Sequence, residues 1–274
     1  MAVMTVDRIA LHYERSGTVG DPAVLIHGSW SDAEVWVRVV PALSQGLQVL
    51  TYDRRGYRES HGPPRDRPVS DDASDLATLL KRTDQYPTHL IGQGYGGIVA
   101  LRLALDRPEL VRSVCAHEPP YVGLLEDWEP AREGPMPPTA PSQSEDALRA
   151  SDARGPAERA SSGPGPGGRG PRARTDVTAQ RWAGYGDRWA EESADPDTRR
   201  PDEGIRSIDT PILLTYGEIG PPTYRAMVER LAGQLRNATV CPLPSAGRLP
   251  ELTDPETFVG VLATFLLERD VPST

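Results

Sequence analysis

The sequence predicts an α/β fold: a doubly wound, mostly parallel sheet with helices on both of its faces. Short continuous apolar runs such as AVLIHG (23–28) are typical of strands that are buried on both sides. They alternate with amphipathic segments such as SDDASDLATLLKRT (70–83), and the same alternation resumes late in the chain. Repeated strand–helix alternation predicts parallel strands joined by crossover helices.

Each expected element has a local reason. Residues 3–15 alternate apolar and polar side chains, as an N-terminal hairpin does. In the expected helix over 31–44, Ser31 or Asp32 is a candidate N-cap, and the expected helix over 70–83 carries acids in its first turn. The remaining expected strands are 23–28, 47–53, 88–93, 110–119, 210–218 and 237–244, and the remaining expected helices are 95–108, 221–235 and 253–269.

The middle of the chain differs in composition from its two ends. We expect a first core part, an insertion and a second core part at 1–128, 129–204 and 205–274. Within the insertion, the low-complexity stretch 129–176 has only two large apolar residues, Met136 and Leu148. Such a stretch buries too little apolar surface to offset the entropy lost on ordering its backbone, so we predict disorder. A shifted reading frame in GC-rich DNA would give a similar composition, which is a second hypothesis for its origin.

Composition excludes several classes of protein. The formal net charge of −9 argues against general binding to nucleic acid or to a membrane surface. No window reaches the ~20 apolar residues of a membrane-spanning helix, and the first residues do not resemble a signal peptide. Cys115 and Cys241 lie in apolar, strand-like segments and are expected as buried free thiols. We therefore expect a cytoplasmic protein that has no metal or cofactor and whose partner is a small molecule.

The stretch HLIGQGYGGIVALRLA (89–104) fits two motifs. As G-x-G-x-x-G it places Gly92, Gly94 and Gly97 between a strand and a helix, where they would cradle a dinucleotide pyrophosphate, with Glu118 as the ribose ligand of an oxidoreductase. Such a fingerprint normally follows the first strand of a sheet, whereas this strand is the third of the core. The other motif is a G-x-S-x-G nucleophile elbow in which Gly94 stands at the serine position.

Three strand ends, taken in order, favour the elbow. The three segments resemble motifs of the α/β-hydrolase family: VLIHGSW its oxyanion loop, YDRRGYRES its Asp-x-x-Gly loop, and GQGYGG its nucleophile elbow. The HEPP that follows the next strand resembles the esterase/lactonase-like branch of the same family. The resemblance covers nearly the whole chain outside 129–204, which corresponds to the family's cap. It implies an oxyanion hole formed by the backbone N–H groups of Ser29 and Tyr95. It also implies a pocket lined by His27, Gly28, Trp30 and Tyr121, with His27 in a structural role.

The resemblance further implies a Ser–acid–His triad, and all three of its positions are substituted. Gly94 stands at the nucleophile position, Gly220 at the acid position and Arg248 at the histidine position. A guanidinium is always protonated near neutral pH and does not act as a general base. Glu118 follows the strand after the elbow, where some family members place the acid, and is therefore the candidate alternative acid.

Two classes of function follow. The protein is a non-hydrolytic lyase, cyclase or isomerase acting on a carbonyl compound, or it is a pseudoenzyme that binds a small carbonyl or carboxylate compound. Arg248 would favour a carboxylate, because a guanidinium can bind one in a bidentate manner. An active esterase or lactonase with relocated catalytic residues is the alternative. Its candidate nucleophiles, chosen by neighbourhood alone, are Ser29, Ser245, Tyr95 and Tyr121.

Overall fold

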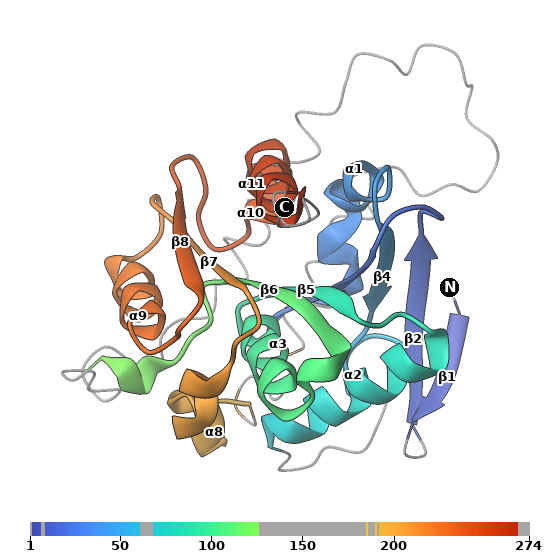
Figure 1. Cartoon of the computed structure of the whole chain (residues 1–274), viewed down its shortest axis with the longest axis horizontal. Helices are drawn as coiled ribbons and strands as arrows, with labels where there is room; N and C mark the ends of the chain where they lie inside the picture. The colour runs from blue at the N-terminus through green and yellow to red at the C-terminus, as the bar shows by residue number, and fades with distance from the viewer. Residues whose placement is uncertain are drawn as a thin grey trace, which may run out of the picture.

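The computed structural model describes residues 2–6, 9–60, 68–125, 185, 190 and 192–267 (Figure 1). Its strands are β1 (Ala2–Val6), β2 (Ile9–Ser16), β3 (Pro22–Ile26), β4 (Gln48–Tyr52), β5 (Thr88–Gln93), β6 (Val111–His117), β7 (Ile212–Gly217) and β8 (Ala238–Leu243). Its helices are η1 (Ala33–Arg38), α1 (Val40–Leu43), α2 (Val69–Thr83), α3 (Tyr95–Asp106), η2 (Pro108–Leu110), η3 (Val122–Leu124), α8 (Pro196–Arg199), η4 (Glu203–Ser207), α9 (Pro222–Ala232), α10 (Pro250–Thr253) and α11 (Pro255–Leu267), where η marks a 3₁₀ helix.

The strands form one eight-stranded sheet in the order β1-β2-β4-β3-β5-β6-β7-β8. The hairpin β1–β2 is antiparallel and pairs with β4 antiparallel, whereas every pair from β4 to β8 is parallel. This confirms the predicted fold class and the predicted N-terminal hairpin. Because the carboxyl ends of parallel strands lie at one edge of a sheet, the loops after β3, β4, β5, β6 and β7 meet there.

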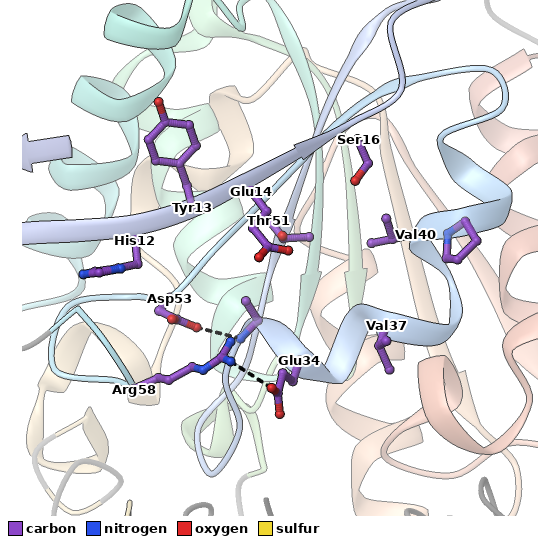
Figure 2. Close-up of a pocket in the computed structure, with 12 residues that line it drawn as sticks. His12, Tyr13, Glu14, Ser16, Glu34, Val37, Val40, Thr51, Asp53 and Arg58 are labelled. Carbon is purple, nitrogen blue, oxygen red and sulfur yellow. Dashed lines mark hydrogen bonds and ion pairs between the residues drawn. The ribbon is translucent and has the colours of Figure 1, made fainter. Parts of the chain in front are cut away.

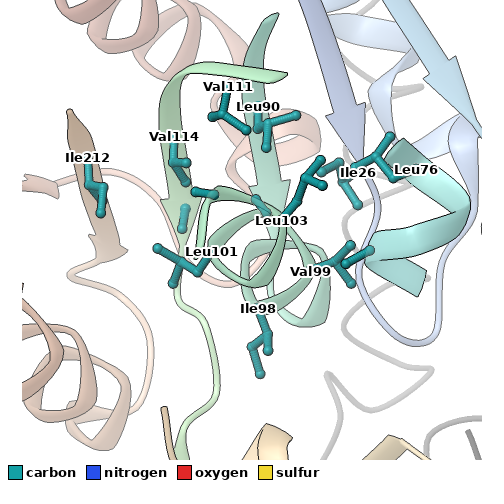
Figure 3. Close-up of a cluster of buried hydrophobic side chains, with 14 of the residues drawn as sticks. Ile26, Leu76, Leu90, Ile98, Val99, Leu101, Leu103, Val111, Val114 and Ile212 are labelled. Atoms are coloured by element: carbon teal, nitrogen blue, oxygen red, sulfur yellow. The ribbon is translucent and has the colours of Figure 1, made fainter. Parts of the chain in front are cut away.

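Two apolar cores cover the two faces of the sheet. On one face α2, α3 and α9 pack on the strands, and Figure 3 shows Ile98, Val99 and Leu103 of α3 among side chains from neighbouring elements such as Leu76 and Leu90. On the other face, η1, α1, α10 and α11 contribute Trp36, Leu43, Leu252 and Phe258 to the second core. Helices on both faces are the doubly wound arrangement that the sequence predicts.

One expected helix is broken, and one cysteine lies differently from the prediction. The segment 31–44 forms η1 and the single turn α1 instead of one helix, because Pro41 has no N–H to donate and the β-branched valines around it disfavour a helix. Asp32 is its cap and accepts a hydrogen bond from the Glu34 N–H at 3.0 Å. The last expected helix, 253–269, is confirmed as α11, and the short helix α10 precedes it. Cys115 is buried, but Cys241 lies on the outermost strand and is only half-buried.

The insertion is only partly described. The predicted disorder of 129–176 lies outside the described residues, and the boundaries 1–128, 129–204 and 205–274 stay predictions. Later in the insertion, the Tyr185 hydroxyl donates to the Asp32 carboxylate at 3.1 Å, and α8 lies against η3. Among the helices that the structure describes, none is long and apolar enough to cross a membrane.

We predict that Gly96→Ala destabilises the fold by about 2 kcal/mol or more, because overpacking against backbone is not easily relieved. A Cβ at Gly96 would overlap the carbonyl oxygen of Ile26. Gly260→Ala is the matched control: it has no atom within 4 Å of the new Cβ and lies exposed in α11, so we expect about 0.5–1 kcal/mol of stabilisation. Urea unfolding midpoints measure both changes, and similar midpoints for the two variants would contradict the close packing of α3 on β3.

Candidate functional site

The turn between β5 and α3 has an unusual backbone conformation at Gly94. Its φ of 55° and ψ of −121° lie where L-residues are strained. The turn is fixed by two hydrogen bonds, from the Gly94 N–H to the His117 carbonyl at 2.8 Å and from the Gly97 N–H to the Gly94 carbonyl at 2.9 Å. A Cβ on Gly94 would nevertheless meet nothing closer than Arg248 Nη2, at 3.6 Å, and Gly28 Cα, at 4.0 Å. The turn thus leaves room for a Cβ at residue 94, which would lie in ordinary van der Waals contact with Arg248.

The other glycines of this turn are required for close packing. A Cβ on Gly92 would overlap the backbone of Gly96, and one on Gly96 would overlap the backbone of β3. A Cβ on Gly97 would approach the Cβ of Ala116 to 3.1 Å. Contacts between helix and strands therefore explain these glycines without a nucleotide.

Arg248 extends its guanidinium into the space beside Gly94. The group stacks on the Tyr224 ring, 4.0 Å from its centroid, and its Nη1 lies 3.4 Å from Glu118 Oε2. The side chain is 15% exposed. One face of the cation is thus covered by an aromatic ring, while Nη2 points toward the position that a side chain of residue 94 would take.

Glu118 occupies the space next to Gly220. It is fully buried, it has a φ of 46°, and its Oε1 accepts a hydrogen bond from the Gly217 N–H at 2.9 Å. A Cβ on Gly220 would lie 3.6 Å from the same Oε1. The structure therefore brings Gly94, Arg248, Glu118 and Gly220 together at one point of the sheet edge.

Both histidines near this edge are bonded to the backbone. His27 Nε2 accepts a hydrogen bond from the Arg54 N–H at 2.9 Å, so its Nδ1 donates to the Gly28 carbonyl at 2.8 Å. His117 Nε2 donates to the Gly247 carbonyl at 3.1 Å, so its Nδ1 accepts from the Thr215 hydroxyl at 2.9 Å. Burial lowers the pKa of both imidazoles, which keeps them neutral. Each histidine braces loops rather than offering a free base.

The remaining predicted residues lie around this point. Ser29 and Trp30 follow Gly28, and Trp30 has a φ of 62°. Tyr95 begins α3, and its hydroxyl donates to Asp72 at 3.2 Å. Tyr121 is buried and lines a separate small cavity with Ile98 and Ile205, on the side of α3 that faces η4.

Two carboxylates at this edge had not been expected. Glu251 lies three residues after Arg248, in α10, and is fully buried. Within the described part of the chain, neither of its carboxylate oxygens has a hydrogen-bond partner. Burial raises its pKa to about 8 and Glu118 adds to that shift, while Arg248 opposes it. The sequence held one signal for Glu251: it lies three residues after Arg248, which stands at the family's histidine position. Glu192 comes from the insertion, and no pattern in the sequence indicates where it lies.

A second hollow lies away from this edge, between β2, β4 and η1 (Figure 2). Its volume is about 250 Å³, and Glu34 and Arg58 pair across one side of it at 2.8 Å. Asp53 accepts a hydrogen bond from the Ala33 N–H at 3.0 Å, and burial raises its pKa to about 6. These groups stabilise the loop after β4. No group of three His, Cys, Asp or Glu side chains suited to a metal is found among the described residues.

We predict that Glu251→Gln changes how stability depends on pH. The folded carboxyl titrates near pH 8, whereas the unfolded one has its ordinary pKa of 4.5, so the folded state alone keeps the proton between these values. Wild-type stability should therefore fall as pH rises through this window, by up to about 1.4 kcal/mol per pH unit from this group. The neutral glutamine removes this loss. The free energy of unfolding in urea of Glu251→Gln, relative to that of wild type, should therefore increase from pH 5 to pH 8.

Glu229→Gln is the control for the Glu251 experiment, because the carboxyl of Glu229 is exposed on the surface of α9. A difference between Glu251→Gln and wild type that stays constant with pH would contradict the buried, protonated state of Glu251.

Comparisons with known proteins agree with this fold. The chain is 31% identical to the hydrolase YraK of Bacillus subtilis over 117 residues, which is 42% of this chain and 43% of that protein. Less than half the length of this curated relative is thus matched. Among solved structures, the enol-lactonase of Burkholderia xenovorans has a TM-score of 0.70 at 20% identity, over 97% of this chain and 100% of that one.

A second structure, Est816, described as degrading N-acyl homoserine lactones, has a TM-score of 0.73 at 21% identity over 96% of this chain and 100% of that one. At these identities the two solved structures are evidence for the fold. The model of the alpha/beta hydrolase family matches residues 23–261, from β3 into α11. Because that match spans most of the chain, this protein belongs to the alpha/beta hydrolase family.

Proposed function

We propose that this protein has lost triad chemistry and binds a small carboxylate, or a carbonyl compound that develops negative charge, at Gly94. One observation carries the proposal: the Arg248 guanidinium lies 3.6 Å from the Cβ position of residue 94, where a serine hydrolase would hold its nucleophile. A fixed cation thus replaces both the nucleophile and the base.

The three family positions do not supply hydrolysis. Gly94 has no nucleophilic atom, Gly220 has no carboxylate, and Arg248 keeps its proton. Loss of such a catalytic unit costs on the order of 10⁶ in rate. Of the four candidate relocated nucleophiles, the Ser29 hydroxyl is engaged with Glu192 and Ser245 is exposed.

Several features favour an anion at this point. The N-terminus of the 12-residue helix α3 lies directly after Gly94, and a helix N-terminus attracts negative charge. We assign the oxyanion donors to the backbone N–H groups of Ser29 and Tyr95, which do not depend on side-chain identity. Burial raises the pKa of Glu251 to about 8, so this carboxyl adds no negative charge beside Arg248 near neutral pH.

The same proposal covers the rest of the chain. We retain the predicted division of the chain into a first core part, a cap insertion and a second core part at 1–128, 129–204 and 205–274. Lactones and esters, the compounds named for structural neighbours such as the enol-lactonase, carry the carbonyl oxygen that this site would accept. Two free cysteines fit the cytoplasm, where thiols stay reduced.

We predict that two substitutions, Gly94→Ser and Arg248→His, restore ester hydrolysis. The serine has room at residue 94, and Glu118 is placed to orient the new histidine. Wild type should hydrolyse short p-nitrophenyl esters no faster than buffer, and the double variant at least about 100-fold faster, since general base catalysis alone gives that factor. Adding Gly220→Asp should give no further gain, because its carboxylate would crowd Glu118.

Gly94→Ala with Arg248→His is the matched control, since it introduces the same backbone strain without a hydroxyl. It should be as inactive as wild type. Hydrolysis by wild type well above buffer would instead support the alternative, an active esterase or lactonase with a relocated nucleophile.

A further inference from the structure

A carboxylate of the chain itself already lies at the sheet edge. Glu192 Oε1 accepts hydrogen bonds from Arg54 Nη2 and from the Tyr57 hydroxyl, each at 2.8 Å, and its Oε2 accepts one from the Ser29 hydroxyl. Glu192 belongs to the insertion, whereas the three donors come from the loops after β3 and β4. Three donors from two core loops therefore converge on the two oxygens of one carboxylate.

Arg54 is held in place by contacts that do not involve Glu192. Its side chain is 1% exposed, and its guanidinium lies between the rings of Tyr57 and Tyr95, 4.5 Å from each centroid. Its Nε donates to the His27 carbonyl at 3.0 Å, its Nη2 also donates to the Gly28 carbonyl at 3.2 Å, and its Nη1 lies 3.4 Å from Asp72. The cation is thus preorganised before a carboxylate arrives.

The other two donors are also fixed. Burial and the Glu192 carboxylate raise the pKa of Tyr57, so its hydroxyl keeps its proton and donates. Ser29 follows Gly28, the residue whose Cα would lie 4.0 Å from a Cβ on residue 94. Ser29, and Arg54 through its hydrogen bond to the Gly28 carbonyl, therefore lie close to the place where we propose the ligand binds.

We propose that Ser29, Arg54 and Tyr57 form a second carboxylate-binding subsite, which Glu192 fills until a ligand carboxylate replaces it. This inference rests on the proposed function in that the ligand reaches both subsites from the same sheet edge. The matching ligand is a small compound with a carboxylate at one end and a carbonyl or second carboxylate at the other. Succinate is the simplest probe of this class.

Removal of Glu192 tests the subsite directly. Glu192→Ala leaves the three donors without this acceptor, and acetate should refill the space. We expect saturating acetate to raise the Tm of the variant by about 5 °C more than it raises that of wild type, which offers acetate only the Arg248 site. Acetamide, a neutral molecule of the same shape, should not reproduce the effect. Equal shifts in variant and wild type, or no shift in the variant, would overturn the proposal.

Two further variants assign the shift to these residues. Adding Tyr57→Phe to Glu192→Ala should weaken acetate binding about tenfold, the usual loss for one hydrogen bond to a charged group. Adding Arg248→Gln should leave intact the extra shift that Glu192→Ala creates. A shift that Arg248→Gln abolishes would place acetate at the Arg248 site and overturn the second subsite. If acetate still raises the Tm of the Glu192→Ala variant while wild type binds no carboxylate, the second subsite is supported and the proposed function is contradicted.

Glu192→Gln provides a test in a variant of nearly native shape, should Glu192→Ala not fold. The amide keeps the volume of the side chain but removes the competing negative charge. We expect succinate to bind this variant about tenfold more tightly than wild type in a calorimetric titration. Equal affinity would show that Glu192 does not compete with the ligand, and would overturn the proposal.

Discussion

The buried guanidinium of Arg54 is the constraint on which the sheet edge depends. A charge taken out of water is costly unless every donor finds an acceptor. Arg54 meets this requirement with carbonyls after β3, with Asp72 of α2 and with Glu192 of the insertion, while Tyr57 and Tyr95 cover its faces. Removing one partner would leave buried charge uncompensated. The loops that border Gly94 are therefore fixed by a network that contains none of the three triad positions.

This separation explains how the elbow can keep its shape without a nucleophile. The conformation of Gly94 follows from hydrogen bonds to His117 and within α3, and from glycines that let α3 approach the sheet. None of these requires a side chain at residue 94. At the same time Arg248, Glu118 and Tyr224 form a connected group of cation, carboxylate and ring. The Arg248 cation at this position suits the binding of an anion. Cleavage of an ester would instead need a general base at the same position.

Much of the fold could be predicted because its signals are local. Apolar runs that end in glycine or in polar residues mark β3, β4 and β5, and each lies within about two residues of its expected position. The meeting of Gly94, Gly220, Arg248 and Glu118 could be predicted because the resemblance to the α/β-hydrolase family assigned these positions to one site. The prediction of one helix over 31–44 was wrong, because it did not take Pro41 into account. Glu192 was missed because its contacts lie more than 130 residues away in sequence. Glu251 was missed because burial is a tertiary property.

The measurement that tests the central claim most directly is a calorimetric titration of acetate into wild type and into Arg248→Gln, with acetamide as the neutral ligand. Binding of acetate to wild type, weakened at least about tenfold by Arg248→Gln and absent for acetamide, is the predicted result. Equal binding by the two proteins, or no binding of acetate to wild type, would contradict the claim that Arg248 has turned a catalytic position into an anion site.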